Sequence, residues 1–306
     1  MTTFAEEYRT LREGCGLADR SSAGLLELTG KDRQRFLNAY VTCEVKDLTA
    51  GQSIYGFFTN PQGRILSDVA VLALEDRFWL EVGPGQEEAI ASHLQKYILA
   101  DRVEVRPLAG VRLLTLIGPR AEEVLPHGGD VKIQPDGRFG APAWTLWTPA
   151  AEAESLAERL IENGARPVGT EALEVLRTEA GIPRFGQDFG PDNFPQETGE
   201  EGAVSYTKGC YLGQEVVARI HYRGGVQKTL RGLVFEPGTA PGPGVQLLYE
   251  GRQAGVATTV VQSITLGRPV GLGILHKRAA EPGTRLQMEA IEQVGEVEVR
   301  ELPLVP

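Results

Sequence analysis

Short apolar runs alternate with Pro/Gly turns from Leu230 to the end of the chain. The turns include Glu236-Pro-Gly238 and Pro241-Gly-Pro-Gly244, and no stretch with helical spacing interrupts the pattern. Short strands at this spacing predict an antiparallel all-β domain, and closure into a small barrel removes its sheet edges. The expected strands are 230–235, 245–249, 254–262, 270–275, 285–289 and 294–300.

The preceding part of the chain mixes strand and helix patterns. Residues 52–59 and 64–74 are predicted strands, joined by the turn Asn60-Pro-Gln-Gly63. Apolar residues at helical spacing mark helices within 31–42, 86–99 and 151–163. A chain of 306 residues usually forms two or three domains. We therefore predict the α+β class, with a body of two lobes over 1–225 and a barrel over 226–306.

The net charge of −10 argues against one broad class of partner. Such a chain repels phosphate backbones, so we expect no nucleic-acid binding by the chain itself. The polar stretch Met1–Gly14 does not resemble a signal or transit peptide, and no run approaches the roughly 18 apolar residues of a membrane span. The simplest expectation is a cytoplasmic protein that does not enter a membrane.

The three cysteines are widely spaced and form no CxxC pair. This usage argues against a disulfide framework and for a reducing compartment. An iron–sulfur cluster usually takes four thiolates, which one copy of the chain cannot supply, so no resident metal is predicted. Cys15 and Cys43 have no feature that would activate a thiol, and packing is the expected role of both.

The segment Lys208-Gly209-Cys210-Tyr211-Leu212-Gly213-Gln214-Glu215 is the most unusual in the chain. Two glycines close to a cysteine predict a tight turn or a close backbone approach. Helical spacing after the segment predicts that a helix begins at Gln214 or Glu215. Cys210 would then lie just before a helix N-terminus and near the Lys208 ammonium, both of which favour a thiolate.

Other interpretations of these residues stay open. Cys210 could be a small buried hydrophobic residue, as most free cysteines are. A Cys–His dyad with His221 is weakly indicated, because eleven residues and a helix separate the two. His93 lies on an apolar helical stripe and is expected to pack.

The same segment resembles the signature of the YgfZ family, followed by an Arg and Gly run like Arg219 to Gly225. Leu28 to Leu37 and Tyr55 to Asp68 resemble the opening that this family shares with the glycine-cleavage T-protein. Leu176-Arg-Thr-Glu-Ala-Gly-Ile-Pro183 and Gly271-Leu-Gly-Ile-Leu275 resemble a helix end and a barrel strand of both families. The resemblance covers nearly the whole chain.

The resemblance implies a three-lobed ring that binds tetrahydrofolate, or a one-carbon derivative, in a central opening. Asp68 matches the acid directed at the folate nitrogens, a role that suits a hydrogen-bond acceptor able to move protons. Arg177, Glu179 and Glu197 match further positions that could line the cavity. Without the resemblance, Asp68 would be a solvated strand residue, and a helix-end salt bridge would explain Arg177 and Glu179 equally well.

Two segments depart from the aminomethyltransferase pattern. Trp144-Thr-Leu-Trp-Thr-Pro149 lacks the glycine–acid pattern of the pterin-holding segment, and Val82-Gly-Pro84 replaces Val-Asn-Ala. The leading hypothesis is therefore a folate-binding accessory protein for assembly or repair of [4Fe–4S] proteins, in which Cys210 transiently contacts a cluster, a persulfide or a partner thiol. The alternatives are a folate-dependent one-carbon transferase and a non-catalytic folate-sensing module.

Overall fold

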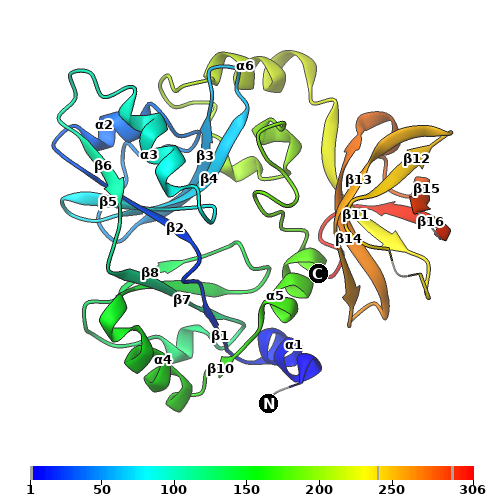
Figure 1. The fold of residues 1–306 in the computed structure, drawn as a ribbon, viewed down its shortest axis with the longest axis horizontal. Helices are drawn as coiled ribbons and strands as arrows, with labels where there is room; N and C mark the ends of the chain where they lie inside the picture. The colour runs from blue at the N-terminus through cyan, green and yellow to red at the C-terminus, as the bar shows by residue number, and fades with distance from the viewer. Residues whose placement is uncertain (1–2, 240, 291–292) are drawn as a thin grey trace.

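A computed structural model describes residues 3–239, 241–290 and 293–306. Within these ranges the chain forms two five-stranded sheets and a closed six-stranded barrel. Figure 1 shows the two sheet-containing lobes one above the other, with the barrel beside them. The predicted α+β class with a small C-terminal barrel is confirmed. No helix in the described part of the chain is long and apolar enough to span a membrane.

The first sheet has the strand order β3-β4-β5-β2-β6. Its strands are β2 (Gly24–Thr29), β3 (Ser53–Thr59), β4 (Ile65–Ala73), β5 (Arg77–Val82) and β6 (Glu104–Pro107). Helices α2 (Arg33–Asn38) and α3 (Glu87–Gln95) supply buried side chains to the core over this sheet, among them Leu37 and Leu94. The predicted hairpin is confirmed, with Gly63 at a φ of 75° in its turn, a conformation that favours glycine. His93 packs edge-on against Tyr97.

The second sheet has the strand order β10-β1-β7-β9-β8. Its strands are β1 (Gly16–Asp19), β7 (Val111–Ile117), β8 (Lys132–Pro135), β9 (Ala143–Pro149) and β10 (Arg166–Pro167). Helix α4 (Ala153–Glu162) packs its Leu156 and Leu160 against this sheet, while α1 (Phe4–Glu13) packs on α5 (Thr170–Ala180). Because β1 precedes the first sheet and β7 follows it, the two lobes are interwoven along the chain.

The segment between α5 and the barrel carries little regular structure. It holds the short 3-10 helices η3 (Pro195–Glu197) and η4 (Glu201–Ala203), then α6 (Gln214–Arg219) and one π-helical turn, η5 (Ile220–Gly224). The predicted helix start at Gln214 is confirmed. Phe57, Phe189, Tyr211 and Val217 form a cluster that joins this segment to the first sheet.

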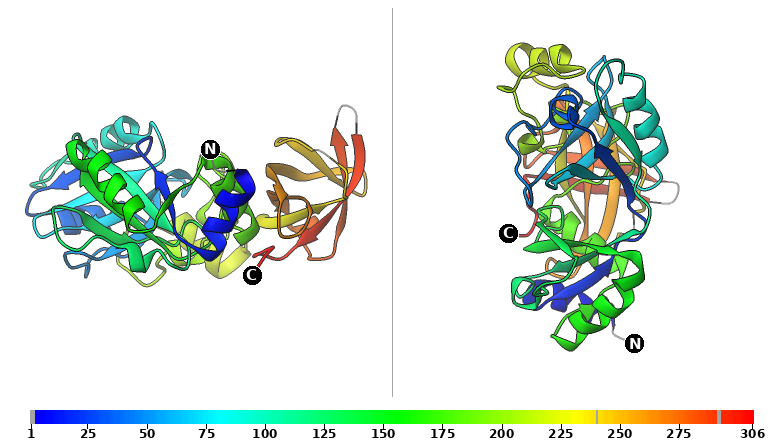
Figure 2. Two further views of the ribbon diagram at one scale, coloured as in Figure 1. Left: turned by 90° about the horizontal axis from the view of Figure 1, so that it is seen from below. Right: turned by 90° about the vertical axis from the view of Figure 1, so that its left-hand side faces the viewer.

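The barrel closes in the order β11-β14-β13-β12-β15-β16. Its strands are β11 (Lys228–Phe235), β12 (Val245–Tyr249), β13 (Arg252–Ser263), β14 (Arg268–His276), β15 (Arg285–Ala290) and β16 (Gln293–Arg300). Leu233, Leu247, Leu275 and Val299 belong to its interior core. After β16 the chain returns to α5, where the amides of Leu304 and Val305 donate to the Glu179 carbonyl. Figure 2 shows the C-terminus where the barrel meets the rest of the chain.

Candidate functional site

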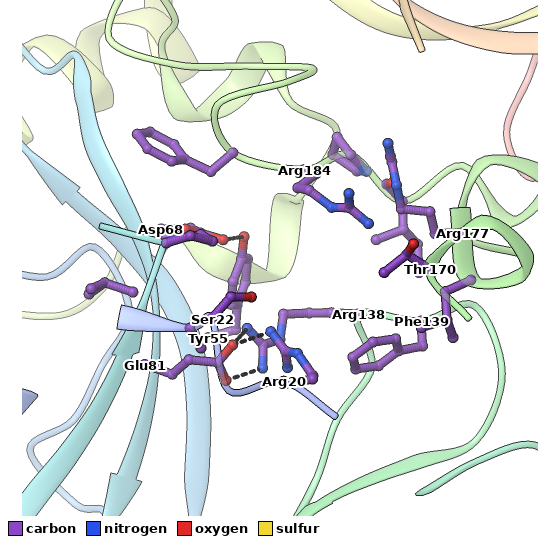
Figure 3. Close-up of a pocket in the computed structure, with 18 of the residues that line it drawn as sticks. Arg20, Ser22, Tyr55, Asp68, Glu81, Arg138, Phe139, Thr170, Arg177 and Arg184 are labelled. Atoms are coloured by element: carbon purple, nitrogen blue, oxygen red, sulfur yellow. Dashed lines mark hydrogen bonds and ion pairs between the residues drawn. The ribbon is translucent and has the colours of Figure 1, made fainter. Parts of the chain in front are cut away.

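A cavity of about 250 Å³ lies where the two sheets meet α5 and the loop that follows it. Strands β3, β4 and β5 form one side of it, and Arg138 and Phe139 come from the loop between β8 and β9. Figure 3 shows Asp68 and Glu81 on the first sheet, with Arg177 and Arg184 across the opening. Charged groups therefore converge on this cavity from several parts of the chain.

Asp68 lies within the cavity lining, as the resemblance implies. It sits on β4 opposite Phe57, and its Oδ2 accepts a 3.0 Å hydrogen bond from the Tyr55 hydroxyl. Burial raises the pKa of Asp68, while the Arg138 charge and the Tyr55 hydrogen bond oppose that rise. Burial also raises the pKa of Tyr55 well above its ordinary value, so the phenol remains a donor. A carboxyl in this setting can both accept hydrogen bonds and exchange a proton.

A second carboxyl, Glu200, lines the same cavity from the start of η4. Burial raises the pKa of Glu200, and the Asp68 charge adds to the rise while the Arg138 charge opposes it. The cavity thus contains two acidic groups whose protonation is shifted in the same direction.

Arg138 anchors the floor of the cavity between the lobes. Its guanidinium donates to both oxygens of Glu81, at 3.0 and 2.6 Å, and to both oxygens of Asp136, at 2.8 and 2.6 Å. Arg20 also donates to Glu81. Burial alone would raise the pKa of each carboxyl, but the arginine charges outweigh it and lower both. Since Glu81 belongs to the first sheet and Asp136 follows β8 of the second, this network joins the two lobes.

Arg177 lines the cavity, whereas Glu179 does not. Arg177 Nη1 donates to Asp188 at 2.8 Å, and Nη2 donates to Thr259 of the barrel at 2.9 Å. Glu179 is fully buried, and its carboxylate accepts hydrogen bonds from Tyr8 and, at 2.6 Å, from Ser263. Both side chains therefore connect α5 to other parts of the fold, and only Arg177 borders the cavity.

Glu197 also lies outside the cavity lining. Its Oε2 accepts from the Asn193 side-chain amide at 3.1 Å and from the Phe194 backbone amide at 3.2 Å. The Glu197 side chain thus caps the N-terminus of the short helix η3 and stabilises the loop that precedes Glu200.

The segment 208–215 lies apart from the cavity lining and is pinned to the first lobe. Lys208 Nζ donates to the carbonyls of Val41 at 2.8 Å and Cys43 at 2.6 Å, so its ammonium is committed to the backbone and not to Cys210. Tyr211 is buried, and the Leu212 amide donates to Ala39.

The two glycines of this segment differ in role. Gly213 has a φ of 83°, and a Cβ there would lie 2.5 Å from the Asn60 carbonyl oxygen, so a close approach requires glycine. Gly209 is exposed, and a Cβ there would meet nothing within 4 Å. Gln214 and Glu215 open α6. The close approach predicted for the pair therefore holds at Gly213 alone.

The three thiols occupy two kinds of environment. Burial raises the pKa of Cys15 to about 11 and that of Cys43 to about 12, so both are inert packing groups. Cys210 is exposed, against the alternative of a buried packing residue. His221 stacks on Tyr206 with ring centroids 3.7 Å apart, and no hydrogen bond joins it to Cys210 within the described ranges.

The cavity residues that the sequence did not predict include Tyr55, Glu81, Arg138 and Glu200. Tyr55 lies in a predicted strand, where its spacing from Asp68 across the Asn60–Gly63 turn could have placed both on one face. Arg138 and Glu200 are single charged residues in loops, and no local spacing marks them.

Comparisons with known proteins agree with this architecture. Residues 1–139 match the GCVT N-terminal domain, and residues 228–306 match the glycine cleavage T-protein C-terminal barrel domain. An aminomethyltransferase of Alkaliphilus metalliredigens is 27% identical over 92% of this chain and 84% of its own length. One of Bacillus licheniformis is 29% identical over 98% of this chain and 87% of its own length.

A solved structure gives the same result. The glycine cleavage system aminomethyltransferase T from Bartonella henselae superposes with a TM-score of 0.90 at 26% identity, covering 99% of this chain and 89% of the other. Two domain matches at opposite ends of the chain and a superposition along its whole length place every lobe in the same architecture. The chain therefore carries both domains of the glycine-cleavage T-protein and belongs to the GcvT-like superfamily.

Proposed function

We propose that this protein binds tetrahydrofolate, or a one-carbon derivative of it, in the cavity around Asp68. The observation that carries the proposal is a half-buried carboxyl, Asp68, which has a raised pKa, is oriented by Tyr55 and faces a cavity between the lobes. A reduced pterin presents several N–H donors, for which carboxylates are suitable acceptors. When bound, the reduced folate supplies ring nitrogens that can carry a one-carbon unit.

The other residues of the cavity fit the parts of such a ligand. Phe139 and Phe185 provide apolar surface for a flat ring. Arg184 at the opening pairs with Glu174 through Nη2, and its half-exposed guanidinium keeps further N–H donors for a ligand carboxylate. The Tyr55 hydrogen bond holds the Asp68 carboxyl in place, so Asp68 needs little rearrangement to accept a hydrogen bond from a ligand. Asp68 would hold or release a proton at its carboxyl during binding or group transfer.

Calorimetric titration with tetrahydrofolate tests this proposal. Wild-type protein should bind saturably, and Asp68→Asn should weaken binding about tenfold or more, because it removes a charged acceptor. Asp47→Asn makes the same chemical change at an exposed position and should bind like wild type. Equal binding by Asp68→Asn and wild type would overturn the assignment of Asp68, and no binding by wild type would overturn the folate proposal.

For the role of the bound folate, we propose support of the assembly or repair of [4Fe–4S] proteins through Cys210. The observation that favours it is an exposed thiol on a loop that Lys208 and Leu212 pin to the first lobe. One thiolate suits transient contact with a cluster, a persulfide or a partner thiol. Three free thiols fit a reducing compartment such as the cytoplasm.

The surface beside the thiol suits a transient protein partner. Exposed Tyr222 and His221 form an aromatic group with half-buried Tyr206. Arg219 on α6 and Arg223 on η5 are also exposed. A basic and aromatic surface on a chain of net charge −10 favours an acidic region of an iron–sulfur client or assembly protein.

A second candidate is a folate-dependent one-carbon transferase, favoured by the relatives named aminomethyltransferase. A third is a folate-sensing module without turnover. Cells that lack this protein should regain [4Fe–4S] enzyme activity with the wild-type gene but not with Cys210→Ala, if the accessory role holds. Full recovery of [4Fe–4S] enzyme activity with Cys210→Ala would rule out a role for this thiol. Consumption of methylenetetrahydrofolate by purified Cys210→Ala would then support the transferase, and its absence the sensing module.

Thiol labelling supplies the control for that experiment. In native protein one thiol per chain should react rapidly, and all three should react after unfolding, because Cys15 and Cys43 are buried. Cys210→Ala should lose only the rapid reaction and keep the thermal unfolding temperature of wild type.

A further inference from the structure

The side chain of Glu200 lines the cavity and is available to a ligand, while hydrogen bonds hold its backbone in place. Its amide donates to the Thr198 hydroxyl at 3.2 Å, and its carbonyl accepts from the Ala203 amide at 3.1 Å. Among residues 3–239, 241–290 and 293–306, no hydrogen bond or ion pair reaches its carboxylate. A partly buried acid without a protein partner is costly unless something else satisfies it.

The neighbouring cations are already neutralised. Arg138 binds Glu81 and Asp136, and Arg20 approaches the same two carboxylates. On the other side of the cavity, Arg177 pairs with Asp188, and Arg184 pairs with Glu174. On each side of the cavity two arginines balance two carboxylates. Ionised Asp68 and Glu200 therefore add a negative charge that no cation among the described residues balances.

We infer that Glu200 is a second ligand-contacting residue, which acts with Asp68 to select a ligand rich in N–H donors. This inference rests on the proposed folate function and narrows it to a reduced ring. Tetrahydrofolate carries N–H groups at ring nitrogens that are bare acceptors in folic acid. Two carboxylates in one cavity attract the N–H donors of tetrahydrofolate and repel the nitrogen lone pairs of folic acid.

Proton exchange on binding is a second consequence of this arrangement. The groups that face Glu200 are Asp68, hydrogen-bonded by Tyr55, and Arg138, held by Glu81 and Asp136. Burial and the Asp68 charge raise the pKa of Glu200, so a fraction of the free protein carries a proton there as the pH falls. A ligand that donates hydrogen bonds favours the ionised carboxylate, so its binding releases protons.

The test compares Glu200→Gln with Glu201→Gln, which makes the same change at the exposed neighbour on η4. Titrations with tetrahydrofolate and folic acid, repeated in buffers of different ionisation enthalpy, give affinity and protons released. Glu200→Gln should bind tetrahydrofolate about tenfold or more weakly, lose part of its preference over folic acid, and release fewer protons. Glu201→Gln should match wild type in all three measurements.

The outcomes separate this inference from the folate proposal. If Glu200→Gln keeps wild-type affinity, preference and proton release while Asp68→Asn loses binding, Glu200 is no ligand contact and the folate site stands. If wild-type protein binds neither folate, both ideas fail. Thermal unfolding guards against misfolding: Glu200→Gln removes a disfavoured charge, so its unfolding temperature at neutral pH should not fall below that of wild type. A lower temperature would show that the carboxylate stabilises the fold, which would overturn its assignment to a ligand.

Discussion

Tyr55 and Asp68 lie one diagonal step apart on neighbouring strands, and the Tyr55 hydroxyl donates a 3.0 Å hydrogen bond to Asp68 Oδ2. The register pairs Tyr55 with Ala70 and Asp68 with Phe57, which places both side chains on the same face of the hairpin. The hydrogen bond favours the ionised carboxylate, but burial outweighs it and raises the pKa of Asp68. The ionised Asp68 carboxylate therefore destabilises the folded protein when no ligand is bound.

Replacing Asp68 with Asn should stabilise the ligand-free protein at neutral pH. Because the pKa is higher in the folded chain than its ordinary 3.8, ionisation is disfavoured in the folded state, and that cost is present above the raised value and absent below the ordinary one. Asp68→Asn should melt at a higher temperature than wild type near neutrality, and the difference should vanish in acid. A lower melting temperature at neutral pH would contradict this account.

Replacing Arg138 with Met should lower the free energy of unfolding, because it removes the ion pairs that join the two lobes. The change leaves Glu81 and Asp136 buried without their main partner, which typically costs about 3–5 kcal/mol. Both carboxyls have lowered pKa values, so the stability they contribute is present above the ordinary carboxyl range and is lost as the pH falls. The advantage of wild type over Arg138→Met in urea unfolding should therefore shrink in acid.

An exposed ion pair provides the comparison for Arg138. Arg285 pairs with Glu296 across β15 and β16, with 70% of the Arg285 side chain exposed. Arg285→Met should change the free energy of unfolding much less than Arg138→Met does, because solvent screens this exposed pair. Similar losses in the two variants would mean that the network at the cavity floor is no stronger than a surface pair.

The elements of this fold were predictable where the pattern is local. All six barrel strands follow from alternation and turn residues, since each strand is defined by its own side chains and flanking turns. The interwoven lobes were not predictable, because β1 pairs with β7 and β10 from distant parts of the chain. No pattern within Gly16–Asp19 identifies those partners.

The same limit applies to the candidate site. Asp68 was identified by family resemblance, and it lies in the cavity. Arg138 reaches Glu81 only because the two sheets pack together, and no spacing in the sequence encodes that meeting. Lys208 was expected to favour a thiolate at Cys210 because the two are close in sequence. Its ammonium instead binds two carbonyls of the first lobe.

Removal of the Glu179 side chain should destabilise the fold and spare the cavity. Glu179→Ala deprives Tyr8 and Ser263 of their acceptor and leaves a void between α1, α5 and the barrel, at a cost of roughly 3 kcal/mol. Glu171→Ala, at an exposed position of the same helix, should cost much less. Tetrahydrofolate affinity should stay at the wild-type value below the melting transition. Weaker tetrahydrofolate binding by Glu179→Ala below that transition would show that Glu179 belongs to the ligand site, as the resemblance implies.

Replacing Lys208 with Met tests whether this lysine anchors the loop or activates the thiol. Met keeps the apolar stem but leaves the carbonyls of Val41 and Cys43 without their donor, which should cost about 1–3 kcal/mol. Burial lowers the pKa of Lys208 from 10.5 to about 8. The unfolded chain therefore binds more protons between those values, and stability rises with pH across that interval.

The advantage of wild type over Lys208→Met in chemical unfolding should grow as the pH rises through about 8. Amide hydrogen exchange over residues 205–212 should be faster in Lys208→Met, because this segment loses its attachment to the first lobe. The rate of thiol labelling at Cys210 should follow the mobility of the loop and increase. A decrease in that rate would instead show that the ammonium stabilises the Cys210 thiolate, and the sequence-based expectation would then be correct.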